Sequence, residues 1–177
     1  MNKLNARQLR TTENPDPQQL RKIKKNPIYI VLDNVLDTYN VGAIFRLADA
    51  VAATKIYLCG QTETPPNPRI KKASVNTWKW VDWEYSESAE EAIRKLKKEI
   101  PGLQVAVIEQ NNKSTMLKNF VPTFPILIVV GNETFGVSIG VLHLADNIIE
   151  LPMFGINNSL NVMVCLGIVL YRIAEHF

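Results

Sequence analysis

The sequence predicts an α/β protein whose mostly parallel sheet is flanked by helices. Short runs rich in β-branched and other apolar residues, such as 28–32, 55–59 and 126–130, are typical of strands buried on both faces. Helical patterns lie between these runs, and this alternation favours parallel strands joined by helices. Ligands of such sheets bind beyond the carboxyl ends of the strands, so we expect functional residues in the loops that follow them.

The expected elements follow one another at short intervals. We expect strands at 28–32, 55–59, 81–85, 103–108, 126–130 and 148–151, and helices at 41–52, 89–100, 138–145 and 159–175, with a short helix near 18–25. Asn40 and Ser159 are the expected N-caps of the first and last long helices, because their side chains can accept from free backbone N–H groups. From Val162 to Tyr171 the last helix is apolar on every face, which predicts burial in a core or in a subunit contact.

Length and composition indicate one domain of ordinary globular type. The chain has 177 residues, of which 46% are hydrophobic and 21% charged. No apolar run opens the chain, and the C-terminal run of about ten apolar residues is shorter than the roughly 20 that cross a membrane. Cys59 and Cys165 fit neither a zinc nor a redox spacing. We therefore expect reduced thiols in a cytoplasmic protein without a metal site or a membrane contact.

Positive charge is concentrated at the N-terminus. Residues 1–25 hold seven Lys or Arg and two acidic residues, a net of +5, which leaves −2 for the rest of a chain of net charge +3. Three prolines among polar residues indicate that 1–27 is a basic arm before a domain at 28–177. Such an arm suits contact with a phosphate backbone, and from charge alone a merely solvated arm is an equal alternative.

Three loops carry the polar residues expected to do chemistry. The first runs into a helix at 40–46, where Arg46 lies roughly 140° from the apolar stripe and so points away from the core. The second, at 131–136, has two glycines that allow a sharp turn close to a ligand. In the third, at 151–161, a proline and a glycine leave backbone groups free to hold a flat heterocycle. Each loop alone is also compatible with an ordinary turn, and the glycine fingerprint of a dinucleotide fold is absent from the sequence.

Together and in this order, the loops resemble the signature motifs of the TrmH-type (SpoU) RNA ribose methyltransferases of the SPOUT superfamily. The motifs are Asn40-Val41-Gly42-Ala43-Ile44-Phe45-Arg46, Gly131-Asn132-Glu133-Thr134-Phe135-Gly136, Leu151-Pro152-Met153 and Ser159-Leu160-Asn161-Val162. The resemblance spans 28–175 and implies a C-terminal deep trefoil knot, which general topology rules do not predict. It also implies bound S-adenosylmethionine, a homodimer through the knot and the C-terminal helix, and methyl transfer to a ribose 2′-hydroxyl of tRNA or rRNA.

The resemblance assigns roles to individual residues. Arg46 matches the central catalytic residue, and we expect an electrostatic clamp rather than a base, unless the bound RNA takes the proton, because a guanidinium group is almost never deprotonated. Asn40 and Asn161 would orient Arg46, Glu133 would contact the substrate or fix Arg46, and Ser159 would line the site. The expected cofactor contacts are Gly131, Asn132, Gly136, Leu151, Met153, Ser159 and Leu160. The expected RNA contacts are Arg7, Arg10, Arg21, Lys22, Lys24, Lys25, Lys71 and Lys72.

Two features leave room for other interpretations. The stretches 52–54 and 72–78 lack glycines that the family often has, which bears on the subfamily. Tryptophans 78, 80 and 83 favour core or interface packing over base stacking. The main alternative is a catalytically inactive RNA-binding protein of the same fold, and the intact Arg46, Glu133, Ser159 and Asn161 speak against it.

Overall fold

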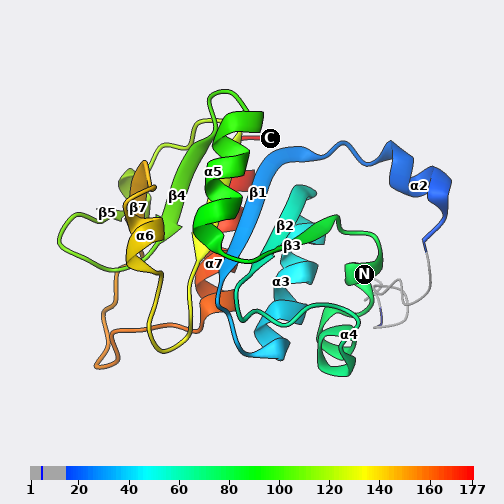
Figure 1. The fold of residues 1–177 in the computed structure, drawn as a ribbon, viewed down its shortest axis with the longest axis horizontal. Coiled ribbons are helices and arrows are strands. Elements are labelled where there is room, and N and C mark those ends of the chain that lie inside the picture. Colours follow the sequence, from blue (N-terminus) through cyan, green and yellow to red (C-terminus); the bar gives the residue numbers. More distant parts are fainter. Residues whose placement is uncertain (1–4, 6–14) are drawn as a thin grey trace.

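Figure 1 shows the protein as a computed structural model, which describes residue 5 and residues 15–177. Seven strands form one sheet in the order β3-β2-β1-β6-β4-β7-β5, and every neighbouring pair is parallel. The strands are β1 (Asn26–Asp33), β2 (Ala53–Cys59), β3 (Trp83–Ser86), β4 (Gln104–Ile108), β5 (Thr115–Met116), β6 (Ile126–Val130) and β7 (Asn147–Glu150). The predicted parallel sheet is confirmed.

Helices connect the strands and cover both faces of the sheet. They are α2 (Pro17–Lys22), α3 (Thr38–Ala50), α4 (Pro68–Ser74), α5 (Ala89–Glu99), α6 (Ile139–Leu142) and α7 (Val162–Ala174), with 3-10 turns η1 (Thr77–Lys79) and η2 (Leu117–Asn119). The sequence did not predict α4, which starts where Asn67 accepts from the backbone N–H groups of Arg69 and Ile70. No helix in the described part of the chain is long and apolar enough to cross a membrane.

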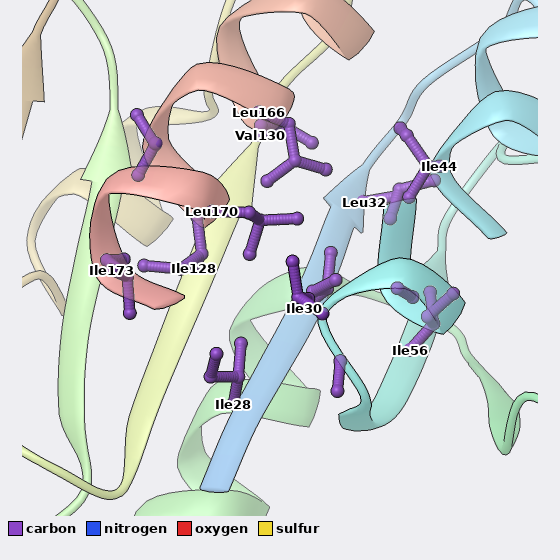
Figure 2. Close-up of a cluster of buried hydrophobic side chains, with 14 of the residues drawn as sticks. Ile28, Ile30, Leu32, Ile44, Ile56, Ile128, Val130, Leu166, Leu170 and Ile173 are labelled. Atoms are coloured by element: carbon purple, nitrogen blue, oxygen red, sulfur yellow. The ribbon is translucent and has the colours of Figure 1, made fainter. Parts of the chain in front are cut away.

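Alternating side chains of β1 build two separate cores. Ile28, Ile30 and Leu32 pack with α3 and α7 on one face, as Figure 2 shows. Val31 points to the other face, where it joins the core formed by α5 and α6. The central strands are thus buried on both sides, which explains their unbroken apolar sequence.

Both predicted N-caps are wrong by a few residues. Asp37 caps α3 by accepting from the N–H of Tyr39 at 2.8 Å, so Asn40 lies inside the first turn. Asn161, not Ser159, caps α7, since its Oδ1 accepts from the N–H of Met163 at 2.9 Å. Several polar residues precede each helix, and the path of the loop decides which of them reaches the free N–H groups.

The last helix is buried on one face only. Leu166, Leu170 and Ile173 are fully buried, whereas Ile168 and Tyr171 on the opposite side are 44% and 56% exposed. The predicted burial is therefore confirmed for the face that meets the sheet, and an apolar stripe stays uncovered in the single chain. The trefoil knot remains a prediction.

Candidate functional site

A cavity of about 610 Å³ opens where β4, β6 and β7 end. This volume lies within the range of small-molecule sites, roughly 300 to 1,000 Å³. Three segments line it, at 108–110, 130–136 and 149–165. All seven predicted cofactor residues are among the lining residues: Gly131, Asn132, Gly136, Leu151, Met153, Ser159 and Leu160. The structure therefore brings the second and third predicted loops together at the carboxyl edge of the sheet.

The loop after β6 folds tightly back on itself. The backbones of Asn132 and Gly136 exchange two hydrogen bonds of 3.0 and 2.9 Å, and Gly136 has a φ of +69°. A Cβ on Gly131 would lie 2.3 Å from the carbonyl carbon of Gly136 and 2.4 Å from the nitrogen of Val137. Since these are backbone atoms that cannot rotate away, the glycine is required by a close approach of the two ends of the loop.

A network of amides and a carboxylate joins all three predicted motifs. Asn161 Nδ2 donates to Asn40 Oδ1 at 3.0 Å, and Asn40 Nδ2 donates to Glu133 Oε1 at 2.9 Å. Glu133 also accepts from the backbone N–H groups of Leu36 at 3.0 Å and Asp37 at 3.1 Å. Glu133 and Asn161 line the cavity, so the network stands on its rim.

The hydrogen bonds set the ionisation of Glu133. Partial burial alone would raise the pKa of this carboxyl, but the bonds from Asn40 and from backbone N–H groups outweigh it and lower the pKa below its ordinary value. Glu133 is therefore an ionised acceptor near neutral pH. That state suits holding Asn40 in place and does not suit a general base, which needs a pKa near the working pH.

Arg46 does not join this network within one chain, so the expectation that Asn40 and Asn161 orient it stays a prediction. Arg46 is exposed, and it makes no hydrogen bond or ion pair with the other described residues. It follows Asn40 by six residues on α3, which places it about 9 Å further along the helix and about 120° around it. It lines instead a second cavity of about 390 Å³ beside α2 and η1.

Sequence reasoning missed several residues of the first cavity. Glu109, Gln110 and Cys165 line it, and Gln110 Nε2 donates to the backbone carbonyl of Asn158 at 3.0 Å. Glu109 and Gln110 directly follow β4, and the rule that ligands bind beyond the carboxyl ends of strands could have found them. Ser159 lines the cavity as predicted, but its side chain forms no hydrogen bond with any described residue.

The predicted RNA contacts fall on two short helices and the segment before β1. Arg21 and Lys22 on α2, Lys24 after it, and Lys71 and Lys72 on α4 are exposed. Lys25 is half-buried. Arg7 and Arg10 lie outside the described residues.

The tryptophans serve packing, as expected. The Nε1 of Trp80 donates to Asp49 at 2.7 Å, and the ring of Trp83 meets Phe45 edge-on at 6.5 Å between centroids. Trp78 is partly buried and packs against the same core.

Cys59 and Cys165 are both free thiols. Among residues 15–177 no group of three His, Cys, Asp or Glu side chains is placed to hold a metal ion.

A parallel α/β sheet binds its ligands beyond the carboxyl ends of its strands, and here a cavity of ligand size lies at that edge with a hydrogen-bonded network on its rim. The profile of the SpoU rRNA Methylase family matches residues 27–171, which is most of the chain. The chain therefore belongs to this family, as its three motifs predicted.

Individual relatives agree with the family. The tRNA (guanosine(18)-2′-O)-methyltransferase of Aquifex aeolicus is 31% identical over 165 residues, which cover 88% of this chain and 74% of that protein. The crystal structure of the A. aeolicus TrmH/SpoU tRNA modifying enzyme is similar with a TM-score of 0.80 and 30% identity, over 89% of this chain and 80% of that one. The AdoMet-bound rRNA methyltransferase of Sinorhizobium meliloti has a TM-score of 0.79 and 27% identity, over 89% of this chain and only 60% of that one.

Proposed function

We propose that this protein transfers a methyl group from S-adenosylmethionine to a ribose 2′-hydroxyl of tRNA, with rRNA as the second substrate to test. The observation that carries the proposal is the network of Asn40, Glu133 and Asn161 on the rim of the cavity, because it unites all three motifs at one place. The A. aeolicus relative is named for this reaction on tRNA, and the S. meliloti structure contains the cofactor.

The cavity has the features that the cofactor needs. Its volume suits a nucleoside-sized ligand, and Gly131 allows the backbone of the loop to approach closely. Leu151, Met153 and Leu160 supply apolar walls, with peptide groups for the polar edge of a base. When bound, S-adenosylmethionine supplies the methyl group on a positively charged sulfur.

The residues of this chain position the nucleophile and stabilise its charge. A 2′-hydroxyl must shed its proton as its oxygen takes the methyl group, so negative charge develops on that oxygen. The ionised Glu133 fixes Asn40, which in turn fixes Asn161 at the mouth of the cavity. We assign to Arg46 the clamp on the ribose oxygen or on the adjacent phosphate, since a guanidinium group offers a positive charge and several N–H donors.

We further propose that Arg46 acts on the cavity of a second copy. In one chain Arg46 lies apart from the cavity, while Val164, Ile168 and Tyr171 leave an apolar stripe of α7 uncovered. A homodimer would cover that stripe, and α7 packs against α3, the helix that carries Arg46. The basic arm at 1–27 and the lysines of α4 would then hold the RNA backbone.

The activity is tested with bulk tRNA and bulk rRNA from cells that lack the gene. Purified protein with tritiated S-adenosylmethionine should label one of the two RNAs, at ribose 2′-oxygens. Arg46→Ala should lose labelling by at least a hundredfold and still bind the cofactor in calorimetry. An RNA-binding protein without activity would retain both RNAs on a filter and label neither, and that outcome would overturn the proposal.

Mixing two inactive variants tests the second copy. Gly131→Ala damages the cavity of one copy, and Arg46→Ala removes the clamp from the other copy. In a mixed dimer the intact cavity and the intact Arg46 therefore belong to different copies, and they form a working site only if Arg46 acts across the dimer. Activity should return when the two variants are denatured and refolded together. No recovery in dimers shown to be mixed would place Arg46 and the cavity in the same chain.

A further inference from the structure

Phe135 is an aromatic side chain held out into solvent at the rim of the cavity. Its side chain is 87% exposed, whereas Phe45 and Phe120 are buried. Its sequence neighbours Thr134 and Gly136 both line the cavity. An exposed aromatic ring beside a binding site offers a face on which a flat group of a ligand can stack.

The backbone under this ring is fixed on several sides. The N–H of Phe135 donates to Asn132 Oδ1 at 3.0 Å, and Asn132 Nδ2 donates to the carbonyl of Asn34 at 2.9 Å. Beyond the ring, Glu109 Oε2 accepts from the N–H of Val137 at 2.9 Å. The next residue is held in the same way, because the buried Asp33 accepts from the N–H of Ser138 at 2.8 Å. The loop therefore presents the ring from a fixed position, which lowers the entropic cost of binding against it.

The chemistry around Phe135 favours one kind of ligand group. The segment 131–140 contains Glu133 and no Lys or Arg, and Glu109 supports the loop from behind. Such surroundings repel phosphate, but they do not oppose the neutral face of a nucleobase. Aromatic side chains bind single-stranded RNA by stacking on such faces.

We propose that Phe135 is the stacking platform for a base of the RNA substrate, either that of the methylated nucleotide or that of its immediate neighbour. The proposal rests on the proposed function, because it supplies the base contact that places the ribose at the rim. It separates two tasks: the basic residues of α2 and α4 bind phosphates, and Phe135 binds a base. Because every base has a face that can stack, the platform places the nucleotide at the rim without selecting its base.

Four variants test this role. Phe135→Ala and Phe135→Leu remove the aromatic ring, and Phe135→Trp keeps one. Phe177→Ala is the matched control, because Phe177 is also exposed but meets Phe124 edge-on, ahead of β6 and thus at the opposite edge of the sheet. The assays are methyl transfer to the bulk RNA that the wild type labels, calorimetry with S-adenosylmethionine, and the solution mass.

The expected result is a fall in kcat/KM for RNA of about fivefold to a hundredfold in Phe135→Ala and Phe135→Leu, the size of one base–aromatic stack. Phe135→Trp and Phe177→Ala should stay within about twofold of the wild type. Cofactor affinity and solution mass should not change in any variant. A kcat/KM of Phe135→Ala equal to that of the wild type would overturn the proposal.

Two other outcomes also decide the question. If Phe135→Ala lowers the solution mass, the ring belongs to a contact between two copies and the proposal is wrong. If the wild type labels no RNA, the proposed function fails, and stacking is then tested by binding alone. The tryptophan fluorescence of Phe135→Trp, after subtraction of the wild-type fluorescence, should be quenched by the same RNA. A difference spectrum that RNA leaves unchanged would exclude the platform.

Discussion

Asn161 has two tasks in the structure, and two substitutions separate them. Its Oδ1 caps α7 by accepting from Met163, and its Nδ2 donates to Asn40 at 3.0 Å. Asn161→Ser keeps an oxygen that can cap the helix but has no amide to reach Asn40. Asn161→Ala loses both bonds. The difference in stability between the two variants therefore measures the contribution of the cap. The loss of activity that both variants share measures the contribution of the bond to Asn40.

The magnitudes follow from these bonds. Loss of an N-cap costs about 1 kcal/mol, within a range of about 0.5 to 2. For a chain of this size that corresponds to a melting temperature roughly 2 to 4 °C lower for Asn161→Ala than for Asn161→Ser. Loss of the bond to Asn40 is worth about 0.5 to 1.5 kcal/mol, so both variants should lower kcat by about two- to tenfold.

Thermal unfolding, monitored by circular dichroism, measures the effect on stability. Methyl transfer to RNA, assayed on the same preparations, measures the effect on kcat. Equal melting temperatures for the two variants would show that the cap does not contribute to stability. A wild-type kcat in Asn161→Ser would refute the reasoning that the link from Asn161 to Asn40 positions the site. Unchanged cofactor affinity in both variants is the control for an intact cavity.

Two further predictions concern the loop after β6. Gly131→Ala should weaken S-adenosylmethionine binding at least tenfold in calorimetry, because its Cβ would lie 2.3 Å from the backbone of Gly136. Gly155→Ala is the control and should bind the cofactor normally, because no atom lies within 4 Å of its new Cβ. Equal affinities of the two variants would contradict the close approach at Gly131. Since hydrogen bonds such as that from Asn40 lower the pKa of Glu133 in the folded state, the carboxylate stabilises the fold above its ordinary pKa, and this contribution disappears as the pH falls through the lowered value. The melting temperatures of the wild type and Glu133→Gln should therefore converge between about pH 6 and pH 3, and a constant gap would argue against the lowered pKa.

Much of the fold could be predicted because the central strands are buried on both faces. The runs at 28–32 and 126–130 have no polar alternation, and that pattern is typical of a parallel sheet covered by helices on both faces. The helix α4 could not be predicted in the same way. It has seven residues, too few to show a helical period, and its start depends on a single capping residue, Asn67.

The site was predictable as a set of residues but not as a geometry. The motifs identified Asn40, Glu133 and Asn161, and the structure joins their side chains directly. A linear motif does not show which of its residues meet in space, so the sequence could not show that Asn40 bonds to Glu133 and Asn161 while Arg46 lines another cavity. Glu109 was missed for another reason, since it lies in a loop without a recognised motif.

This separation divides the site into two parts with different requirements. The cavity and its network are formed by residues of one chain, so we predict that cofactor binding does not depend on pairing of copies. Arg46 lies on another face of α3, and the apolar stripe of α7 is open beside that helix. We expect a second copy that covers the stripe to bring its Arg46 to the cavity, because α7 packs against the helix that carries Arg46. Methyl transfer would then require two copies, whereas cofactor binding would require one.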